Sequence, residues 1–316
     1  MRARPRAFEM ASLSAGNDVY AGAKAKTWRQ LWLRHSLSVI SALGLGVLAL
    51  VAYHLFSDGD FSFLMTLGSL LVLFAFLLLV AKVAFTRSVK NLSLKTLQCY
   101  ALVFAARLLS ILRYEGYLPY DRSGDWFYKA TEAGALAIVL ALIACVLGPF
   151  RASYKAGADK FSLPGLPPQL GALVLVLPAL LVAALLHPAL NGNFVTDTAW
   201  AFALYLEAVA MLPQFMLFEG ARSDRSAEIS EIEPLEANFV FALAVARALH
   251  LVFWASSFHE LNDKAADAAV ARRFPGHFVV VAQAVNLLFM ADYVWAYLIA
   301  ARAKKPFLPT SATQAI

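Results

Sequence analysis

The sequence predicts an all-α polytopic membrane protein, and composition and periodicity both support this fold class. Hydrophobic residues make up 60% of the chain and charged residues 15%, whereas soluble domains average about 45–50% and about 25%. Eight apolar stretches predict eight transmembrane helices, because each is long enough to cross a bilayer. They cover residues 36–56, 61–81, 96–112, 130–150, 169–187, 198–218, 237–256 and 277–300. No stretch alternates strictly between apolar and polar residues, which argues against a barrel.

Charges between these stretches predict the orientation of the chain. Seven basic residues lie in the segment 1–35, which we expect to be disordered and cytosolic by the positive-inside rule. The acidic link 57–60 then faces the lumen, and basic residues within 82–95, 151–160 and 302–305 mark later cytosolic segments. Both termini are therefore expected in the cytosol. The glycosylation sequon at Asn91 falls on the same side and is expected to stay unmodified.

A short internal repeat predicts how the helices are grouped. The segment 102–107, LVFAAR, is similar to 242–247, ALAVAR, and both lie on helices of the same direction. We expect 36–60 to form an extra helix with a short luminal loop, 61–301 the main helical domain and 302–316 a cytosolic tail. The main domain then divides into three helices, a connector and three helices. Repeats of this kind bind ligands between their halves. Pro178 and Pro213 are expected to kink their helices.

Five charged residues fall inside the apolar stretches and should face the bundle interior, because a charge in lipid is costly. They are Arg107, Glu132, Glu207, Arg247 and Asp292. Two interpretations stay open: the arginines pair internally with the carboxylates, or Arg107 and Arg247 hold the carboxylate of a ligand. The tryptophans Trp200, Trp254 and Trp295 are likewise either residues of the membrane interface or walls of a pocket.

An enzyme is not expected, because no nucleophile with a neighbouring base, phosphate-binding loop or metal-ligand cluster is recognisable. We therefore expect no cofactor and no metal. The formal charge of +6 arises from residues at helix ends and in the amino-terminal segment. Membrane topology and contact with lipids explain this charge better than binding to nucleic acid.

Several motifs resemble the KDEL receptors, the receptors that retain proteins in the lumen of the endoplasmic reticulum. The segment 82–104, KVAFTRSVKNLSLKTLQCYALVF, resembles their first cytosolic loop and second helix, and 200–214, WAFALYLEAVAMLPQ, resembles their fifth helix. Arg247-Ala248-Leu249 with Trp254 is similar to the sixth helix, and Asp292-Tyr293 to the seventh. The resemblance spans residues 61 to about 309. The chain is identified as a divergent member with an extra amino-terminal helix.

The resemblance implies a seven-helix bundle of the SWEET and PQ-loop type that binds the carboxy-terminal tetrapeptide of escaped luminal proteins. Such a receptor cycles between endoplasmic reticulum and Golgi membranes, binds in the acidic Golgi, and returns in vesicles coated by COPI. The residues implied to bind ligand are Arg107, Arg247, Asp197, Trp200 and Trp254. Those implied to act in transport are the interior acids Glu207 and Asp292 and the tail lysines Lys304 and Lys305.

Other positions depart from the family pattern. Met65 stands where the family has the arginine that meets the ligand carboxylate, and Val72 where it has the pH-sensing histidine. Further departures are Leu108, Ser110, Ala246, Phe253 and Ser257. His250 replaces a pocket tyrosine three residues beyond Arg247, and we predict that it binds ligand and replaces the missing pH switch. The alternative is a neutral histidine that is hydrogen-bonded inside the bundle, because an adjacent arginine and apolar burial disfavour the charged form. The alternatives are a paralogue with an altered ligand and a small-solute transporter.

Overall fold

The computed structural model describes residue 44 and residues 62–113, 125–188, 192–223, 234–259 and 275–303. The segment 1–35, the predicted span 36–56 apart from residue 44, and the tail lysines Lys304 and Lys305 lie outside the described residues, so these predictions stay predictions. The helical bundle lies within the unit formed by residues 45–316.

All regular elements among the described residues are helical, as predicted. The long helices are α2 (Ser62–Thr86), α3 (Leu94–Arg113), α4 (Asp125–Leu147), α5 (Leu173–Leu185), α6 (Phe194–Val209), α7 (Leu212–Ser223), α8 (Pro234–Ser256) and α10 (Pro275–Ala303). Two short 3-10 turns, η1 (Arg151–Ser153) and η2 (Pro168–Leu170), precede α5. Seven segments of the described chain are long and apolar enough to cross a membrane, and they match the predicted second to eighth spans.

The predicted span 198–218 is divided into two helices. α6 ends at Val209 and α7 begins at Leu212, so the apolar segment continues through a break beside Pro213. Proline is tolerated in the first turn of a helix, because an amide there has no intrahelical acceptor. The start of α6 is fixed by Asn193, whose side-chain oxygen accepts hydrogen bonds from the amides of Val195 and Thr196 at 3.0 and 3.3 Å.

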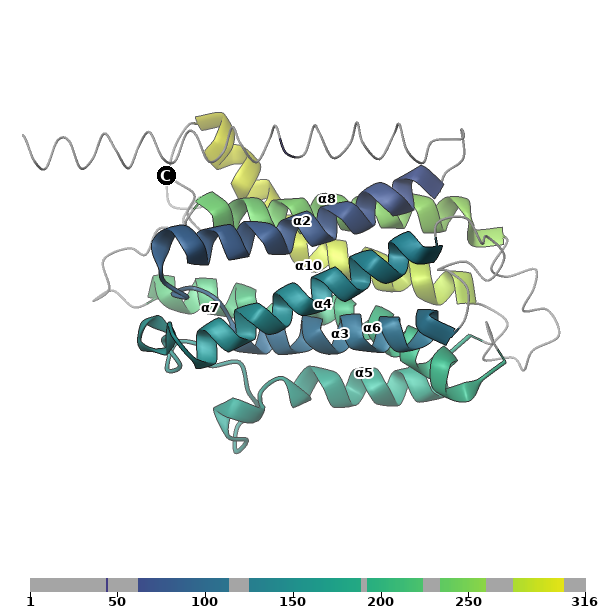
Figure 1. Ribbon diagram of the computed structural model, residues 1–316, viewed down its shortest axis with the longest axis horizontal. Coiled ribbons are helices and arrows are strands. Elements are labelled where there is room, and N and C mark those ends of the chain that lie inside the picture. Colours follow the sequence, from purple (N-terminus) through teal and green to yellow (C-terminus); the bar gives the residue numbers. More distant parts are fainter. Residues whose placement is uncertain are drawn as a thin grey trace, which may run out of the picture. The chain divides into compact units, whose positions relative to one another are not determined.

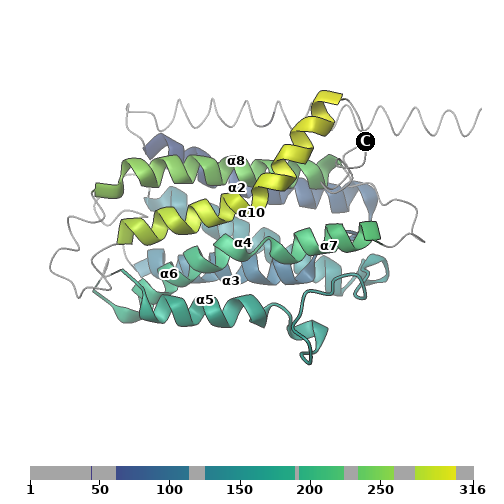
Figure 2. The ribbon, with the colours of Figure 1, turned by 180° about the vertical axis from the view of Figure 1, so that it is seen from behind.

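The helices form two triplets with the same arrangement, which confirms the predicted repeat (Figures 1 and 2). In the first triplet, α4 packs against both α2 and α3; in the second, α10 packs against both α6 and α8. The triplets meet reciprocally, because α2 packs against α8 and α3 against α6. α5 is the connector and packs on α6.

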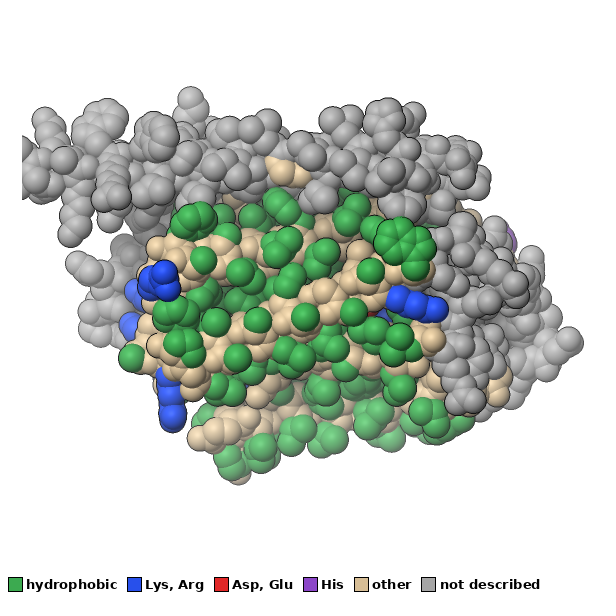
Figure 3. Space-filling view, viewed as in Figure 1, with side chains coloured by type: hydrophobic (Ala, Val, Ile, Leu, Met, Phe, Trp, Pro, Cys, Tyr) green, Lys and Arg blue, Asp and Glu red, His purple; other side chains and the backbone are tan. Residues whose placement is uncertain are grey.

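The outer surface of this bundle suits a lipid environment. Figure 3 shows apolar side chains over the sides of the helices and basic side chains near their ends. Leu177, Leu181 and Leu185 of α5 are all exposed and lie on one side of the connector. In a bilayer these side chains contact acyl chains, so their exposure has little cost.

One predicted interior charge faces outward. Asp292 lies on the exposed side of α10, between Leu288 and Trp295, which are 73% and 63% exposed. The inward side of α10 carries Tyr293, and successive helical residues are rotated by about 100°, so Asp292 points away from the bundle. The expectation that Asp292 faces the interior is wrong.

A buried polar network closes the end of the bundle that we predict to be cytosolic. The Asp159 carboxylate accepts hydrogen bonds from the backbone amide of Leu94 at 3.0 Å, the Ser93 hydroxyl at 3.1 Å and the Tyr154 hydroxyl at 2.9 Å. It also pairs with the Lys95 ammonium at 3.3 Å. Asp159 is 1% exposed. Burial and the neighbouring Asp159 carboxylate raise the pKa of Tyr154, so this phenol stays protonated and can donate.

The same network ties the loop before α3 to the second triplet. Lys82 pairs with Glu236 of α8 at 2.9 Å, and both side chains are buried. The Asn91 side chain donates to the second oxygen of Glu236 at 3.3 Å. Gln214 of α7 donates to the Asn91 carbonyl at 2.7 Å and accepts from the Ser93 amide at 2.9 Å. These bonds satisfy backbone groups that would otherwise be buried without partners.

Candidate functional site

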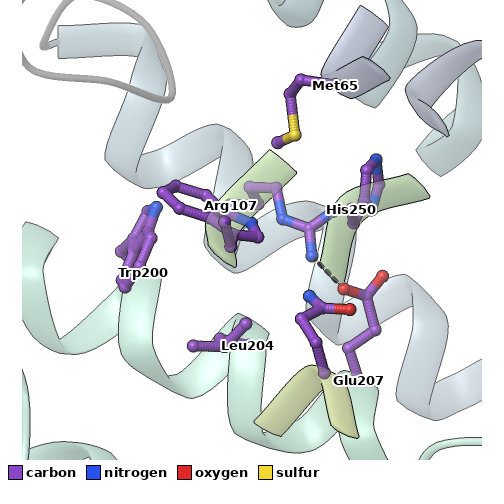
Figure 4. A pocket seen from close by; sticks show the side chains of 8 residues that line it. Met65, Arg107, Trp200, Leu204, Glu207 and His250 are labelled. Carbon is purple, nitrogen blue, oxygen red and sulfur yellow. Dashed lines mark hydrogen bonds and ion pairs between the residues drawn. The ribbon is translucent and has the colours of Figure 1, made fainter. Parts of the chain in front are cut away.

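A cavity lies between the two triplets. It holds about 320 Å³ of empty space, including space open to the surface, and residues of five helices line it. They are Met65 of α2, Arg107 of α3, Trp200, Leu204 and Glu207 of α6, His250 and Trp254 of α8, and Gln283 of α10 (Figure 4). Both halves of the repeat therefore contribute to the lining of the cavity.

The two tryptophans form one wall of the cavity. The rings of Trp200 and Trp254 are 6.0 Å apart and nearly perpendicular, at 82°. Their side chains are 7% and 3% exposed, so the interpretation as membrane-interface residues is wrong and the position in a pocket wall is correct. Perpendicular aromatic pairs of this kind are favourable beyond the apolar area that they bury.

Two arginines share one carboxylate beneath this wall. Arg107 contacts one oxygen of Glu207 and Arg247 the other, each through its Nη2 atom at 2.5 Å. Figure 4 shows Arg107 extending toward Glu207. Arg107 also contacts Glu132 of α4 through Nη1 at 3.0 Å. The interpretation of internal arginine–carboxylate bridges is therefore confirmed for these four residues, and their formal charges sum to zero.

The repeat explains this geometry. Arg107 and Arg247 occupy equivalent positions on α3 and α8, the second helices of the two triplets, and they approach Glu207 from opposite halves. Asn286 of α10 donates to the Glu207 backbone carbonyl at 2.7 Å. Five helices are thus joined around one buried polar cluster, which we call the arginine–glutamate cluster: Arg107, Glu132, Glu207 and Arg247.

His250 extends this cluster toward α2. Nη1 of Arg247 lies 3.2 Å from Nδ1 of His250. A guanidinium can only donate, so the contact requires an unprotonated Nδ1 and assigns the ring proton to Nε2. The ring lies against Gly68 of α2, where a Cβ atom would overlap it. His250 is therefore neutral in this arrangement. Its ring fills the space that is free on α2 because Gly68 has no side chain.

The other predicted residues lie at varying distances from the cavity. Asp197 is buried in the first turn of α6, one turn before Trp200. Met65 lines the cavity and Val72 is buried on α2. Both side chains are uncharged, so α2 adds no charge to the cavity at these two positions. Asp292 points outward. The described residues hold no group of three metal-ligating side chains within reach of one ion.

Sequence reasoning missed Gln283, Leu204 and Gly68. The sequence contained a signal for Gln283. It is a polar residue within the apolar stretch 277–300, and a polar side chain in a membrane span is expected to face the bundle interior, as a charged one is. Leu204 and Gly68 had none, since both are ordinary residues of an apolar helix.

Comparison with known proteins agrees with this architecture. Residues 88–257, more than half of the chain, match the family described as ER lumen protein retaining receptor. Human ER lumen protein-retaining receptor 2 is 28% identical over 236 residues, which cover 73% of this chain and 91% of the human protein. ER lumen protein-retaining receptor erd-2.2 of Caenorhabditis elegans is 28% identical over 227 residues, covering 71% and 87%. The chain therefore belongs to the ER lumen protein retaining receptor family.

Proposed function

We propose that the chain is a receptor that binds carboxy-terminal retrieval signals of endoplasmic-reticulum luminal proteins in the cavity between its triplets. The observation that carries this proposal is the cavity itself, with Arg107, Trp200 and Trp254 on its walls and Arg247 directly behind. Its relatives are named as receptors that retain luminal proteins. An aromatic wall beside guanidinium groups suits a peptide that ends in a carboxylate.

In this proposal the ligand carboxylate lies against Arg107, the arginine that lines the cavity. Arg247 supports it through Glu207, which both arginines contact. Asp197 receives the lysine of the signal, as the resemblance implies; its burial in the turn before Trp200 is compatible with a role beside the aromatic wall.

Charge balance gives a reason for pH dependence. A ligand carboxylate would add one negative charge to the arginine–glutamate cluster, whose formal charge is zero. Protonation of His250 would restore the balance, and it would break the contact with Arg247, because an imidazolium has no acceptor for a guanidinium. The charged groups facing His250 are Arg247 on its own helix, Arg107 of α3 and Glu207 of α6; Met65 and Gly68 of α2 do not titrate.

Peptide titration tests both parts of the proposal. A synthetic peptide ending in Lys-Asp-Glu-Leu is titrated against the purified full chain between about pH 5.5 and 7.5, with its carboxy-terminal amide as the control ligand. Binding should tighten as pH falls, by at most about tenfold per pH unit for one proton, and the amide should bind weakly. His250→Phe should bind with little pH dependence. Absence of binding to any retrieval-type peptide would overturn the proposed function.

We propose further that the chain cycles between endoplasmic reticulum and Golgi membranes through a coat contact of Lys304 and Lys305. The support is sequence alone, because Lys304-Lys305-Pro306 resembles the tail of the receptors. Replacing both lysines by serine should shift the steady state toward post-Golgi membranes, as seen by imaging, whereas Arg302→Ser should not. An unchanged distribution would remove the tail from the sorting mechanism.

One observation favours a receptor with an altered ligand as the second candidate. Met65 lines the cavity at the position where the resemblance implies a carboxylate-binding arginine. A thioether adds apolar surface and no charge there. A peptide library with varied carboxy-terminal residues, tested beside the Lys-Asp-Glu-Leu peptide, distinguishes the candidates, because the altered receptor should prefer an apolar or uncharged group next to Met65.

A further inference from the structure

Gln283 of α10 presents an unsatisfied polar atom at the cavity. Its side chain is 4% exposed and lines the cavity. Its Oε1 atom has no hydrogen-bond partner among the described residues. Burying a carbonyl oxygen without a donor is unfavourable, and native proteins rarely leave such an atom without a reason. A donor supplied by a ligand is such a reason.

The position of Gln283 on α10 is fixed by its neighbours on the same helix side. Val279, Asn286, Met290 and Tyr293 flank Gln283 at helical spacing and are all buried. One turn along, Asn286 is held by its bond to the Glu207 carbonyl of α6. The Gln283 carboxamide is therefore held inside the bundle beside the cavity and cannot turn toward lipid.

His250 does not supply a second such atom. The contact from Arg247 to Nδ1 makes Nε2 the donor of the ring. Nε2 lies against the backbone of α2 beside Met65 and Gly68, where a Cβ atom at position 68 would be 2.3 Å from it. The proton on Nε2 therefore faces α2, and the acceptor offered to a ligand comes from Gln283 of α10.

The charges near the Gln283 carboxamide already balance one another. Each oxygen of Glu207 contacts an arginine, and Arg107 also contacts Glu132. What Gln283 adds is an uncharged acceptor. A backbone N–H is an uncharged donor that every peptide carries, so it can bond to this acceptor without changing the charge balance of the cluster.

We propose that Gln283 is a ligand-binding residue that accepts a hydrogen bond from a backbone N–H of the bound peptide. This inference rests on the proposed function, because it takes a peptide as the ligand. It gives α10 a direct part in recognition. It also makes the backbone of the peptide, besides its carboxylate, a determinant of affinity.

The experiment combines a nearly isosteric substitution with altered ligands. Gln283→Met removes the carboxamide and keeps the side-chain length. Leu288→Met, on the exposed side of the same helix, is the control. The ligands are the Lys-Asp-Glu-Leu peptide and a series in which one backbone N–H at a time is replaced by an ester oxygen.

Gln283→Met should weaken binding of the all-amide peptide about tenfold, the effect of one lost hydrogen bond. One ester should weaken binding to the unaltered chain by a similar factor and bring no further loss in Gln283→Met. The melting temperature of the ligand-free variant should not fall, because the substitution removes an unsatisfied buried atom. Leu288→Met should change neither quantity.

Three results would contradict the inference in different ways. If the unaltered chain binds the peptide and Gln283→Met binds within about twofold of it, Gln283 is not a ligand-binding residue and the proposed function stands. If the unaltered chain binds no such peptide, the proposed function fails and this inference fails with it. Equal additional losses from every ester in both proteins would also count against a specific bond to Gln283.

Discussion

Glu207 holds two guanidinium groups, so its loss should be costly. Both arginines would remain buried with one carboxylate fewer, and breaking a buried ion pair by removing one partner costs about 3–5 kcal/mol. We expect Glu207→Gln to lower the melting temperature of the detergent-purified protein markedly. Glu219→Gln, at an exposed position on α7, is the matched control and should have little effect. Equal melting temperatures for the two variants would show that the arginine–glutamate cluster adds no stability.

We expect that only glycine at position 68 leaves enough room for the ring of His250. A Cβ atom at position 68 would overlap the ring, so Gly68→Ala should destabilise the protein by about 1–3 kcal/mol, the usual cost of overpacking. Gly134→Ala in α4 is the control, since the nearest atom to its Cβ would lie at 3.6 Å, an ordinary contact.

The partner variant makes the Gly68 prediction specific. Combining Gly68→Ala with His250→Ala should cost less than the sum of the two single substitutions, because the new methyl group occupies space vacated by the ring. Thermal unfolding of the four proteins measures this coupling. Additive effects would show that the ring is not what excludes a side chain at position 68.

Residue types in the sequence were enough to predict the arginine–glutamate cluster but not the direction of every side chain. Arg107, Glu132, Glu207 and Arg247 had to be buried because a membrane span offers them no water. Asp292 met the same argument and faces outward, because one residue of helical rotation separates it from the inward Tyr293. For His250 the sequence left two alternatives open, a pH switch and a neutral ring hydrogen-bonded inside the bundle, and the contact with Arg247 in the folded geometry is that of the neutral ring.

At the scale of elements, the start of α3 depends on a carboxylate distant in sequence. Asp159 accepts from the first amide of α3 and from the Ser93 hydroxyl, so it caps the helix from the loop after α4. Asp159→Ala should destabilise the protein by about 2–4 kcal/mol, because buried donors and the Lys95 ammonium lose their acceptor. Lys160→Ala, next in sequence and exposed, should be nearly neutral in the same thermal measurement. A neutral Asp159→Ala would indicate that water replaces the carboxylate.

Helix positions followed from hydropathy, but helix ends did not. α2 continues to Thr86, five residues beyond the predicted 81. The helix does not end where its apolar residues end, because Lys82 continues it into the polar network through its ion pair with Glu236. The predicted span 198–218 begins four residues earlier, at Phe194, where Asn193 caps it. Hydropathy detects lipid contact, whereas caps and side-chain contacts decide where the hydrogen-bonding pattern begins and ends.

At the scale of the whole molecule, the repeat places the candidate site. Because the second helix of each triplet packs against the first helix of the other, Arg107 and Arg247 must approach each other between the halves. The six-residue similarity in the sequence was enough to predict this grouping. It could not predict that Glu207 occupies the meeting point, since that carboxylate lies on a first helix and has no counterpart in the repeated motif.

The orientation of the molecule in the membrane gives the last prediction. Asn91, the buried Lys82–Glu236 pair and the loop containing Asp159 lie at one end of the bundle, joined by hydrogen bonds. We predict that this end is cytosolic, so Asn91 should carry no glycan in cells. Lys264→Thr creates a glycosylation sequon that begins at Asn262, in the link 257–276, which the same topology places in the lumen. Glycosidase treatment should shift the mass of Lys264→Thr and not that of the unaltered chain. A shift that is abolished by Asn91→Gln would reverse the predicted orientation.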